Sequence, residues 1–311
     1  MDFLLLICGI AGLWLGTELT IGGALAIARR HHLSEFFVGL VILSIGSDLP
    51  ELAIATDAGI KTFMGFDASG VVVGASIGSV VAQIGFVLGL AGLIGHLTLP
   101  RSFIYRHGSV LLAATVLLFL VALDGHVSRT EGLTLVTFYV VYVIALMNGA
   151  NKPDEEPSAM AGGGPRSWML LLVGLGAVII SSEITVDAVV KIAHTFDISE
   201  AIISILIIGL GSSLPELSIS IAAIMKKRAE LSVGNIIGSN ILDTLLPIGI
   251  AAVIAGVGFE RPLLFFDLPF IFVLTAVVLA FFLRKRGVRR AEGAIILSFY
   301  ASYVVIKLMQ F

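Results

Sequence analysis

Two short motifs place a glutamate directly after a proline, deep inside apolar stretches of the chain. The first motif is GSDLPE at residues 46–51, and the second is GSSLPE at residues 211–216. Because proline lacks the backbone N–H and disturbs the preceding helical turn, each motif leaves carbonyl groups that need a partner in an apolar environment. Glu51 and Glu216 add a negative charge there, which is costly in lipid and typical of a functional site. Together the motifs predict a cation site built from carboxylates, hydroxyls and carbonyls.

A second pair of polar positions lies in the apolar stretch that follows each motif. Ser79 and Gln83 are four residues apart, as are Ser239 and Asp243, so each pair shares one face of a helix. Asp243 is a buried acid that we interpret as functional. Gln83 has two interpretations at this stage, as a neutral oxygen ligand or as a hydrogen-bond partner between helices.

This set of oxygens favours Ca²⁺ as the bound ion. Two carboxylates at one place repel each other and one keeps its proton, whereas a divalent cation neutralises both. Ca²⁺ takes six to eight oxygen ligands in a flexible geometry, while Mg²⁺ prefers a rigid octahedron with retained water. No His or Cys stands beside the motifs, which argues against Zn²⁺ or Cu²⁺. The six histidines fall near the edges of the apolar stretches, where we expect interfacial or loop positions.

The composition excludes a water-soluble globule of ordinary design. Of the 311 residues 58% are hydrophobic and only 13% are charged, whereas a soluble domain carries about 25% charged residues. The net charge of −3 says little about partners, because the charges lie in loops, and the absence of a basic patch predicts no nucleic-acid partner. The expected surrounding is a lipid bilayer, and no cofactor is expected. The single cysteine, Cys8, lies in an apolar stretch and excludes an internal disulfide.

We count ten apolar stretches long enough, at about 20 residues each, to cross a bilayer. Each is expected to be a helix, because unpaired backbone groups are too costly in lipid. The predicted fold class is therefore an all-α polytopic membrane protein with ten transmembrane helices. The stretches run over 3–28, 34–60, 70–95, 104–123, 130–147, 167–193, 199–225, 231–257, 263–283 and 291–309.

The two halves of the chain repeat each other. A constant offset of 165 residues pairs Glu18 with Glu183 and Glu51 with Glu216, and after a five-residue difference residues 74–89 align with 234–249. Since five crossings reverse the direction of the chain, the repeats must be inverted, as in many secondary transporters. We predict a first repeat at 1–147, a polar linker rich in Pro and Gly at 148–166, and a second, inverted repeat at 167–311.

The distribution of Lys and Arg predicts the orientation. Fourteen of the 19 basic residues fall on the side that also holds the linker, and the richer side is normally cytoplasmic. We therefore expect a multi-pass protein of the plasma (inner) membrane, with a cytoplasmic linker and both termini outside.

These features resemble the α-repeats of the sodium/calcium exchanger family, within the calcium/cation antiporter superfamily, and the chain looks like a prokaryotic-type ten-helix member. The resemblance covers essentially the whole chain, and that family has ten helices in two inverted groups of five. It implies that Glu51 and Glu216 share the central ions. It also implies hydroxyl ligands at Ser47 and Ser212, backbone carbonyl ligands at Ser44 and Gly209, and second-motif ligands at Ser79, Gln83, Ser239 and Asp243.

The first half departs from the family pattern. Asp48 stands where a Ser is usual, as in Ser213, and we include both among the candidate ligands. Ala75 and Val80 stand where Asn is usual, and Gln83 replaces the commoner Asn or Asp. An additional acid favours proton binding, because crowded acids hold protons more readily. Asp48 has two further interpretations, as a lure for cations in the entry path or as a solvated residue in a cavity.

The predicted function is exchange of Ca²⁺ for Na⁺ by alternating access, with Ca²⁺ extrusion and a monomer as the working unit. Spans 1 and 6 are the expected gating helices, sliding over spans 2, 3, 7 and 8. Protons are the alternative coupling ion. A cation channel is a remoter alternative, and an intramembrane enzyme is disfavoured because the chain has no HExxH or GxSxG motif. Glu18 and Glu183 either guide ions, sense protons, or fasten the first helix of each half to its bundle.

Overall fold

The computed structural model describes residues 2–149, 164–195, 211, 213–285 and 287–309. Eight of its helices are long and apolar enough to span a membrane, and a bent pair at 35–63 makes a ninth span. The shorter apolar helix Leu214–Met225 ends the predicted seventh span, whose first part lies outside the described residues. The prediction of an all-helical, multi-pass membrane protein is confirmed.

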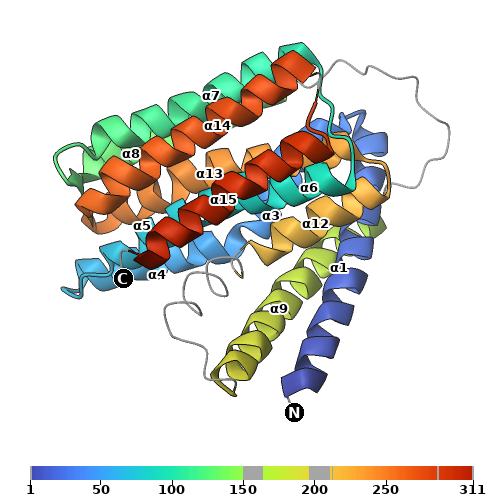
Figure 1. The fold of residues 1–311 in the computed structure, drawn as a ribbon, viewed down its shortest axis with the longest axis horizontal. Coiled ribbons are helices and arrows are strands. Elements are labelled where there is room, and N and C mark those ends of the chain that lie inside the picture. The colour runs from blue at the N-terminus through green and yellow to red at the C-terminus, as the bar shows by residue number, and fades with distance from the viewer. Residues whose placement is uncertain (1, 150–163, 196–210, 212, 286, 310–311) are drawn as a thin grey trace.

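Helices from the two halves of the chain lie side by side in a bundle, such as α7 with α14 and α6 with α15, and one pair is set apart (Figure 1). They are α1 (Asp2–His31), α2 (Glu35–Phe37), α3 (Ser44–Ser47), α4 (Leu49–Phe63), α5 (Ser69–Val81), α6 (Leu88–Ile94), α7 (Arg101–Val121), α8 (Arg129–Gly149), α9 (Pro165–Thr195), α12 (Leu214–Met225), α13 (Ala229–Ala255), α14 (Leu268–Lys285) and α15 (Arg290–Met309). Three π-helical segments, Val38–Leu43, Ala82–Val87 and Leu263–Asp267, and two short strands, β1 (His126–Val127) and β2 (Val257–Gly258), complete the described elements.

Two backbone pairings show the symmetry of the halves. β1 pairs with β2 in antiparallel fashion and sets Val127 opposite Val257. Leu97 and Val288 form a separate antiparallel bridge, each donating its N–H to the other's carbonyl at 2.9 Å. An offset of 160 residues carries Leu97 onto Val257, and an offset of 161 carries Val127 onto Val288. The two pairings are therefore repeats of each other, and the duplication extends beyond the segments that the sequence comparison aligned.

The same symmetry appears where the last helix of each half packs. A Cβ atom added at Gly293 of α15 would lie 2.7 Å from the carbonyl oxygen of Gly89 in α6. A Cβ added at Gly249 of α13 would lie 3.1 Å from the carbonyl oxygen of Gly132 in α8. Offsets of 160 and 161 residues relate these contacts. Each half thus packs its last helix against the other half, so the two repeats interlock.

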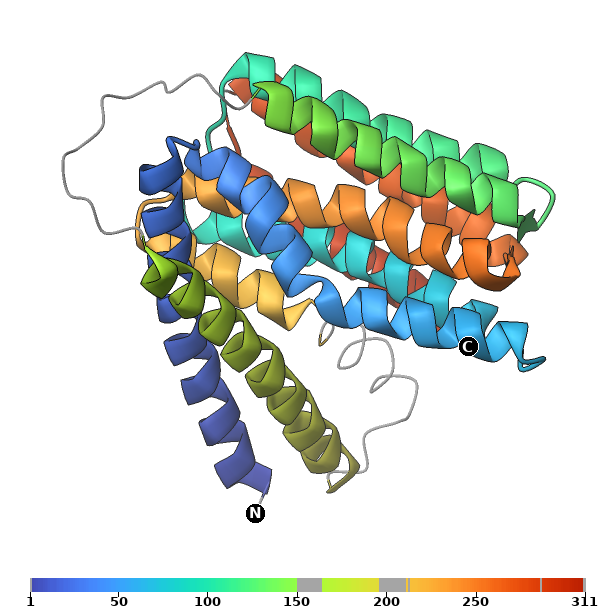
Figure 2. The ribbon, with the colours of Figure 1, turned by 180° about the vertical axis from the view of Figure 1, so that it is seen from behind.

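Helices α1 and α9 form a pair that leans away from the remaining helices (Figures 1 and 2). Small residues allow their backbones to approach closely. Gly9, Gly16 and Gly23 recur every seven residues along α1, and a Cβ at any of them would lie within 3.0 Å of an atom of α9. Because this contact runs along most of both helices, α1 and α9 make up a two-helix unit, here called the α1–α9 pair.

The α1–α9 pair meets the bundle mainly at one end. An apolar cluster separate from the main core joins Ile21 and Leu171 of the pair to Ile219 of α12. The opposite ends of α1 and α9 diverge from the bundle (Figure 2). The other buried members of this cluster are Ala24, Ile27, Ala28, Val38, Leu43, Leu175, Ala223 and Leu231.

The loops gather at the two ends of the molecule in the way that the topology predicts. Arg228 bonds to Glu35 at 2.7 Å, and Arg289 bonds to His96 at 3.1 Å. These contacts bring together connections that were assigned to the same, basic side of the membrane. Which end faces the cytoplasm stays a prediction.

The expected interfacial position of His107 is wrong. Its side chain is 2% exposed inside the bundle, and a ring nitrogen lies 2.8 Å from the Tyr142 hydroxyl. The reason is that α7 begins at Arg101, earlier than the expected start of that span, so His107 lies well inside the helix.

The close approach of α1 to α9 gives a testable prediction. A Cβ at Gly23 would lie 2.6 Å from the backbone nitrogen of Leu171, whereas a Cβ at the neighbouring Gly22 meets nothing within 4 Å. We expect Gly23→Ala to lower the free energy of unfolding by about 1–3 kcal/mol through overpacking, and Gly22→Ala to leave it unchanged or slightly raised. Thermal unfolding of the two purified variants in detergent measures the difference, and equal melting temperatures would contradict the described packing.

Candidate cation-binding site

Both motifs interrupt a helix at the same place in the repeat. Asp48, with φ −87° and ψ 7°, precedes α4, and Ser213, with φ −95° and ψ 10°, precedes α12. Proline occupies the first turn of each following helix, so the carbonyl group four residues before it loses its helical donor. In the second half this carbonyl belongs to Gly211, which accepts a hydrogen bond from the Ser182 hydroxyl of α9 at 3.4 Å. The break bends the second span by 46°.

Four carboxyl groups gather around these breaks. Asp48, Glu216 and Asp243 are fully buried, and Glu51 is 7% exposed. Each of the four interacts electrostatically with the other three. In the part of the chain that the structure describes, no Lys or Arg forms an ion pair with any of them. The result is an acidic cluster, contributed by both halves, without a basic counter-charge among these residues.

Asp243 is held by hydrogen bonds that cross the repeats. The Ser79 hydroxyl donates to Asp243 Oδ2 at 2.8 Å, and Gln83 Nε2 donates to the same oxygen at 3.0 Å. Gln83 Nε2 also donates to Ser79 Oγ at 3.0 Å, and Ser79 Oγ lies 3.4 Å from Ser213 Oγ. Gln83 is therefore a hydrogen-bond partner between helices, as one of the two interpretations proposed. A role as an ion ligand through its free carbonyl oxygen remains a prediction.

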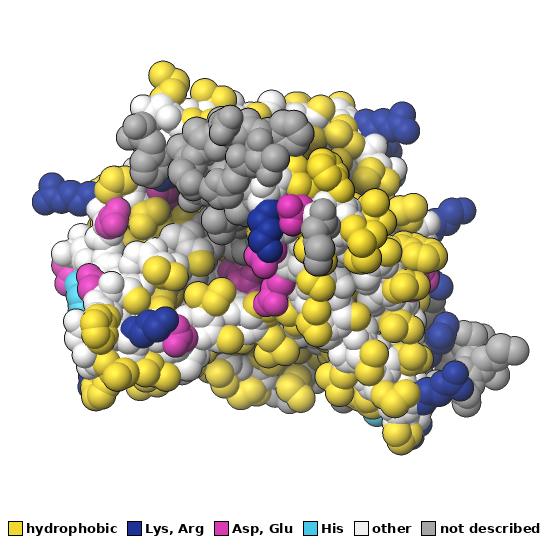
Figure 3. Space-filling model, turned by 90° about the horizontal axis from the view of Figure 1, so that it is seen from below, with side chains coloured by type: hydrophobic (Ala, Val, Ile, Leu, Met, Phe, Trp, Pro, Cys, Tyr) yellow, Lys and Arg dark blue, Asp and Glu magenta, His cyan; other side chains and the backbone are white. Residues whose placement is uncertain are grey.

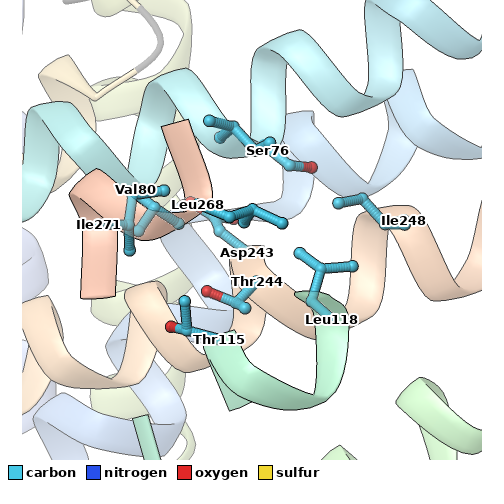
Figure 4. A pocket seen from close by; sticks show the side chains of 10 residues that line it. Ser76, Val80, Thr115, Leu118, Asp243, Thr244, Ile248, Leu268 and Ile271 are labelled. Carbon is cyan, nitrogen blue, oxygen red and sulfur yellow. The ribbon is translucent and has the colours of Figure 1, made fainter. Parts of the chain in front are cut away.

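A small pocket borders Asp243 on the side of α7 and α14 (Figure 4). Ser76 and Val80 of α5, Thr115 of α7 and Thr244 of α13 lie around the aspartate. The space there is too narrow for a water molecule. The packing thus closes this side of Asp243 to water.

Many buried oxygens in this region lack a hydrogen-bond donor. Such unsatisfied acceptors normally cost stability, whereas a cation satisfies several at once. The set combines carboxylate, amide and hydroxyl oxygens, which are ligand types of Ca²⁺. Among the described residues no three acidic or histidine side chains already surround a common point at metal-binding distance, so an ion would have to draw the carboxylates together. The unpartnered atoms are Asp48 Oδ1 and Oδ2, Glu51 Oε2, Gln83 Oε1, Glu216 Oε1 and Oε2, Asn235 Oδ1, Ser239 Oγ, Asn240 Oδ1 and Asp243 Oδ1.

Two residues of the first motif lie beside Glu216 of the second. The carbonyl oxygen of Ser44 accepts from the backbone N–H of Asp48 at 3.0 Å and from the Ser47 hydroxyl at 3.3 Å. Ser47 and Asp48 both lie close enough to interact with the Glu216 carboxyl group. Ser239 is fully buried on α13. Two predicted ligands, Ser212 and Gly209, lie outside the described residues.

A tyrosine beside the cluster was not predicted from the sequence. Tyr139 of α8 is 6% exposed and interacts electrostatically with Asp48 and Asp243. A signal was present in the sequence, because Phe-Tyr-x-x-Tyr occurs at 138–142 and again at 299–303. Without the packing of α8 on α13, nothing in that pattern points to the acidic cluster.

Interlocked inverted repeats around a buried acidic cluster define a polytopic secondary transporter of cations. The family model described as sodium/calcium exchanger protein matches residues 1–148 and 166–309, one match in each half. The chain therefore belongs to the sodium/calcium exchanger family. It is a membrane cation antiporter of that family and not an intramembrane enzyme.

Similar proteins extend over almost the entire chain. The putative antiporter CaxA of Alkalimonas amylolytica is 30% identical over 90% of each chain. The sodium/calcium exchanger MaX1 of Methanosarcina acetivorans is 25% identical over 98% of each chain. A solved structure of the sodium-calcium exchanger NCX_Mj, soaked with Na⁺ and Sr²⁺, matches with a TM-score of 0.83 at 26% identity and covers 98% of this chain and 97% of its own.

The unbalanced acids predict a stability effect in the absence of metal ions. Replacing Asp48→Ser gives the first half the residue of its equivalent, Ser213, and removes a buried carboxyl group without a hydrogen-bond partner. We expect the ion-free protein to gain about 1–3 kcal/mol in free energy of unfolding. Melting curves in chelator measure this gain, with Ser213→Ala as the control that leaves the charge unchanged. A lower melting temperature for Asp48→Ser would show that the carboxyl group has a stabilising partner.

Proposed function

We propose that this antiporter exchanges Ca²⁺ for Na⁺ across the membrane by alternating access, and that Glu51 and Glu216 share the transported ion. The observation that supports this best is the buried acidic cluster, to which both repeats contribute. In the described part of the chain no basic side chain forms an ion pair with this cluster, so transported cations would neutralise its negative charge. Ca²⁺ binds such oxygens at about 2.3–2.6 Å.

The remaining proposed ligands fall into two groups. Hydroxyl, carboxylate and carbonyl oxygens next to the helix breaks would bind the ion together with Glu51 and Glu216, and polar groups of the following helices would complete its coordination. The first group is Ser44, Ser47, Asp48, Gly209, Ser212 and Ser213, and the second is Ser79, Gln83, Ser239 and Asp243.

The charge of the cluster explains why transport is coupled. Burying an ion without a partner costs on the order of several kcal/mol in free energy. An empty, ionised cluster therefore opposes the change between inward- and outward-facing states, while a loaded cluster permits it. Because the change between the two states needs bound cations in both directions, the protein exchanges ions and does not let them leak.

Na⁺ is the proposed counter-ion because MaX1 is named a sodium/calcium exchanger and NCX_Mj was solved after soaking with Na⁺ and Sr²⁺. With the basic end in the cytoplasm and both termini outside, an inward Na⁺ gradient would drive Ca²⁺ out across the plasma (inner) membrane. A monomer contains both halves of the proposed site and is the proposed working unit.

Asp48 favours a second candidate, exchange of Ca²⁺ for protons. With four ionised carboxylates, one Ca²⁺ leaves two negative charges in the cluster. Protons neutralise such excess charge at low cost, because crowded acids hold protons more readily. The two candidates share the same site and differ only in the ion that returns.

The assignment of the shared ligands is tested by ⁴⁵Ca²⁺ uptake into proteoliposomes with an opposed Na⁺ gradient. We expect Glu51→Gln and Glu216→Gln each to lower uptake by at least about tenfold, since loss of one buried charged ligand costs more than about 1.4 kcal/mol. Asp124→Asn, in an exposed loop, is the control and keeps wild-type uptake. Normal uptake by both glutamine variants would refute the assignment, and uptake without any counter-ion gradient would indicate a channel.

The counter-ion is tested with the same vesicles under opposed Na⁺ or pH gradients. If Na⁺ is the natural counter-ion, Na⁺ drives uptake in the wild type and Gln83→Asn strengthens the dependence on Na⁺. If protons are, the pH gradient drives uptake in the wild type and Asp48→Ser weakens that dependence. Unchanged coupling in Gln83→Asn assigns this residue to packing and hydrogen bonding alone.

A further inference from the structure

An ion pair joins the α1–α9 pair to the bundle. Lys226, directly after α12, lies 2.6 Å from the carboxylate of Glu18 in the middle of α1. The two side chains are 36% and 41% exposed. Lys226 belongs to the second repeat and Glu18 to the first, so the contact crosses the halves at the end where the α1–α9 pair touches the bundle.

The repeat supplies a second, equivalent pair of residues that is not joined. The offset of 165 residues carries Glu18 onto Glu183 of α9 and Lys61 of α4 onto Lys226. Lys61 instead pairs with Asp57, four residues earlier in its own helix, at 2.6 Å. Glu183 is exposed and has no ion pair with a described residue. The structure thus makes one of two equivalent contacts.

Apolar residues show the same difference between equivalent positions. Ile219 of α12 is fully buried under the α1–α9 pair, whereas its equivalent Ile54 of α4 is 46% exposed. Leu175 of α9 is 5% exposed, whereas its equivalent Ile10 of α1 is 54% exposed. One end is therefore closed by the α1–α9 pair, and the equivalent surfaces at the other end are uncovered.

We propose that the Glu18–Lys226 and Glu183–Lys61 ion pairs form alternately, one in each of the two opposite-facing states. The proposal rests on the alternating-access function proposed above. In an inverted repeat the two states exchange the roles of the halves. The α1–α9 pair leaves α12, where it now covers Ile219, and moves to α4, where it covers Ile54 and brings Glu183 to Lys61.

The chemistry of the four residues fits this exchange of partners. A carboxylate inside an apolar helix is costly unless water or a cation reaches it. Glu183 is exposed, and acidic side chains gather near the middle of the face toward which the free ends of α1 and α9 point (Figure 3). Its carboxylate would gain a partner when that end closes.

The two lysines differ in this state, because only one of them has an acidic residue four positions earlier in its own helix. Lys61 has Asp57 as a partner on its own helix, while the position equivalent to Asp57 is Ala222 in the second half. Lys61 therefore keeps a partner when the α1–α9 pair is away, and Lys226 does not. This difference favours the state seen in the structure.

The proposal is tested by the reactivity of reporter cysteines at the two equivalent positions. The natural cysteine is first removed with Cys8→Ser, and Ile54→Cys or Ile219→Cys is added singly. A water-soluble maleimide then labels the purified full-length protein in ion-free buffer. In this background we expect position 54 to react faster than position 219.

The charge variants should move the two reporters in opposite directions. Loss of an ion pair of this exposure shifts populations by roughly two- to fivefold. Glu18→Gln and Lys226→Gln should slow labelling at position 54 and speed it at position 219 by that factor. Glu183→Gln should do the reverse, and the double exchange Glu18→Lys with Lys226→Glu should restore the original rates.

Glu35→Gln is the matched control, because it breaks the Glu35–Arg228 ion pair of similar length within the bundle. We expect it to change neither rate. If Glu18→Gln and Glu183→Gln alter the reporters in the same direction, or neither alters them, the proposal is overturned. Ca²⁺ uptake by the wild type, measured on the same preparation, separates this failure from failure of the proposed exchange function, because labelling is read without transport.

Discussion

The central constraint on this protein is the repulsion among four buried carboxylates. In the described part of the chain no basic side chain balances their charge. Asp48, Glu51, Glu216 and Asp243 interact with one another at almost no exposure to solvent. Such a cluster is unfavourable by itself, since buried charge is expensive without a partner. The cluster can serve transport when the partner is the transported cation, because the bound cation then attracts all the carboxylates and offsets their repulsion. Neutralisation by the cargo also explains why the proposed transport requires an ion in each direction.

Duplication gives the site its approximate symmetry, and substitution makes it unequal. The breaks at Asp48 and Ser213 have almost the same backbone angles, yet one carries an acid and the other a hydroxyl. Gln83 and Asp243 occupy equivalent positions and bond to each other across the halves. Packing adds a second difference, because the identical residues Ile54 and Ile219 are uncovered in one half and covered by the α1–α9 pair in the other. In the proposed mechanism, the similarity of the two halves allows two states of similar energy, in which the halves exchange their roles.

Much of the fold and part of the site could be predicted from the sequence. Glu51 and Glu216 stand out because a proline and a charge interrupt an apolar stretch, and the fixed offset between them reveals the repeat. Tyr139 could not be placed beside Asp48, because its position depends on how α8 packs against α13. The Glu18–Lys226 contact joins residues 208 positions apart, so helix periodicity carries no information about it. His107 was misplaced because helix α7 begins before the apolar stretch that marks it.

The most direct test of the central claim is a crystal structure with Sr²⁺ in place of Ca²⁺, located by its anomalous scattering. We expect a strong peak between Glu51 and Glu216, with carboxylate oxygens of both within about 2.7 Å, slightly more than the distance expected for Ca²⁺. Asp243 or the hydroxyl groups beside it should complete the coordination. A peak elsewhere, or two glutamates that stay apart with apolar side chains between them at saturating Sr²⁺, would contradict it.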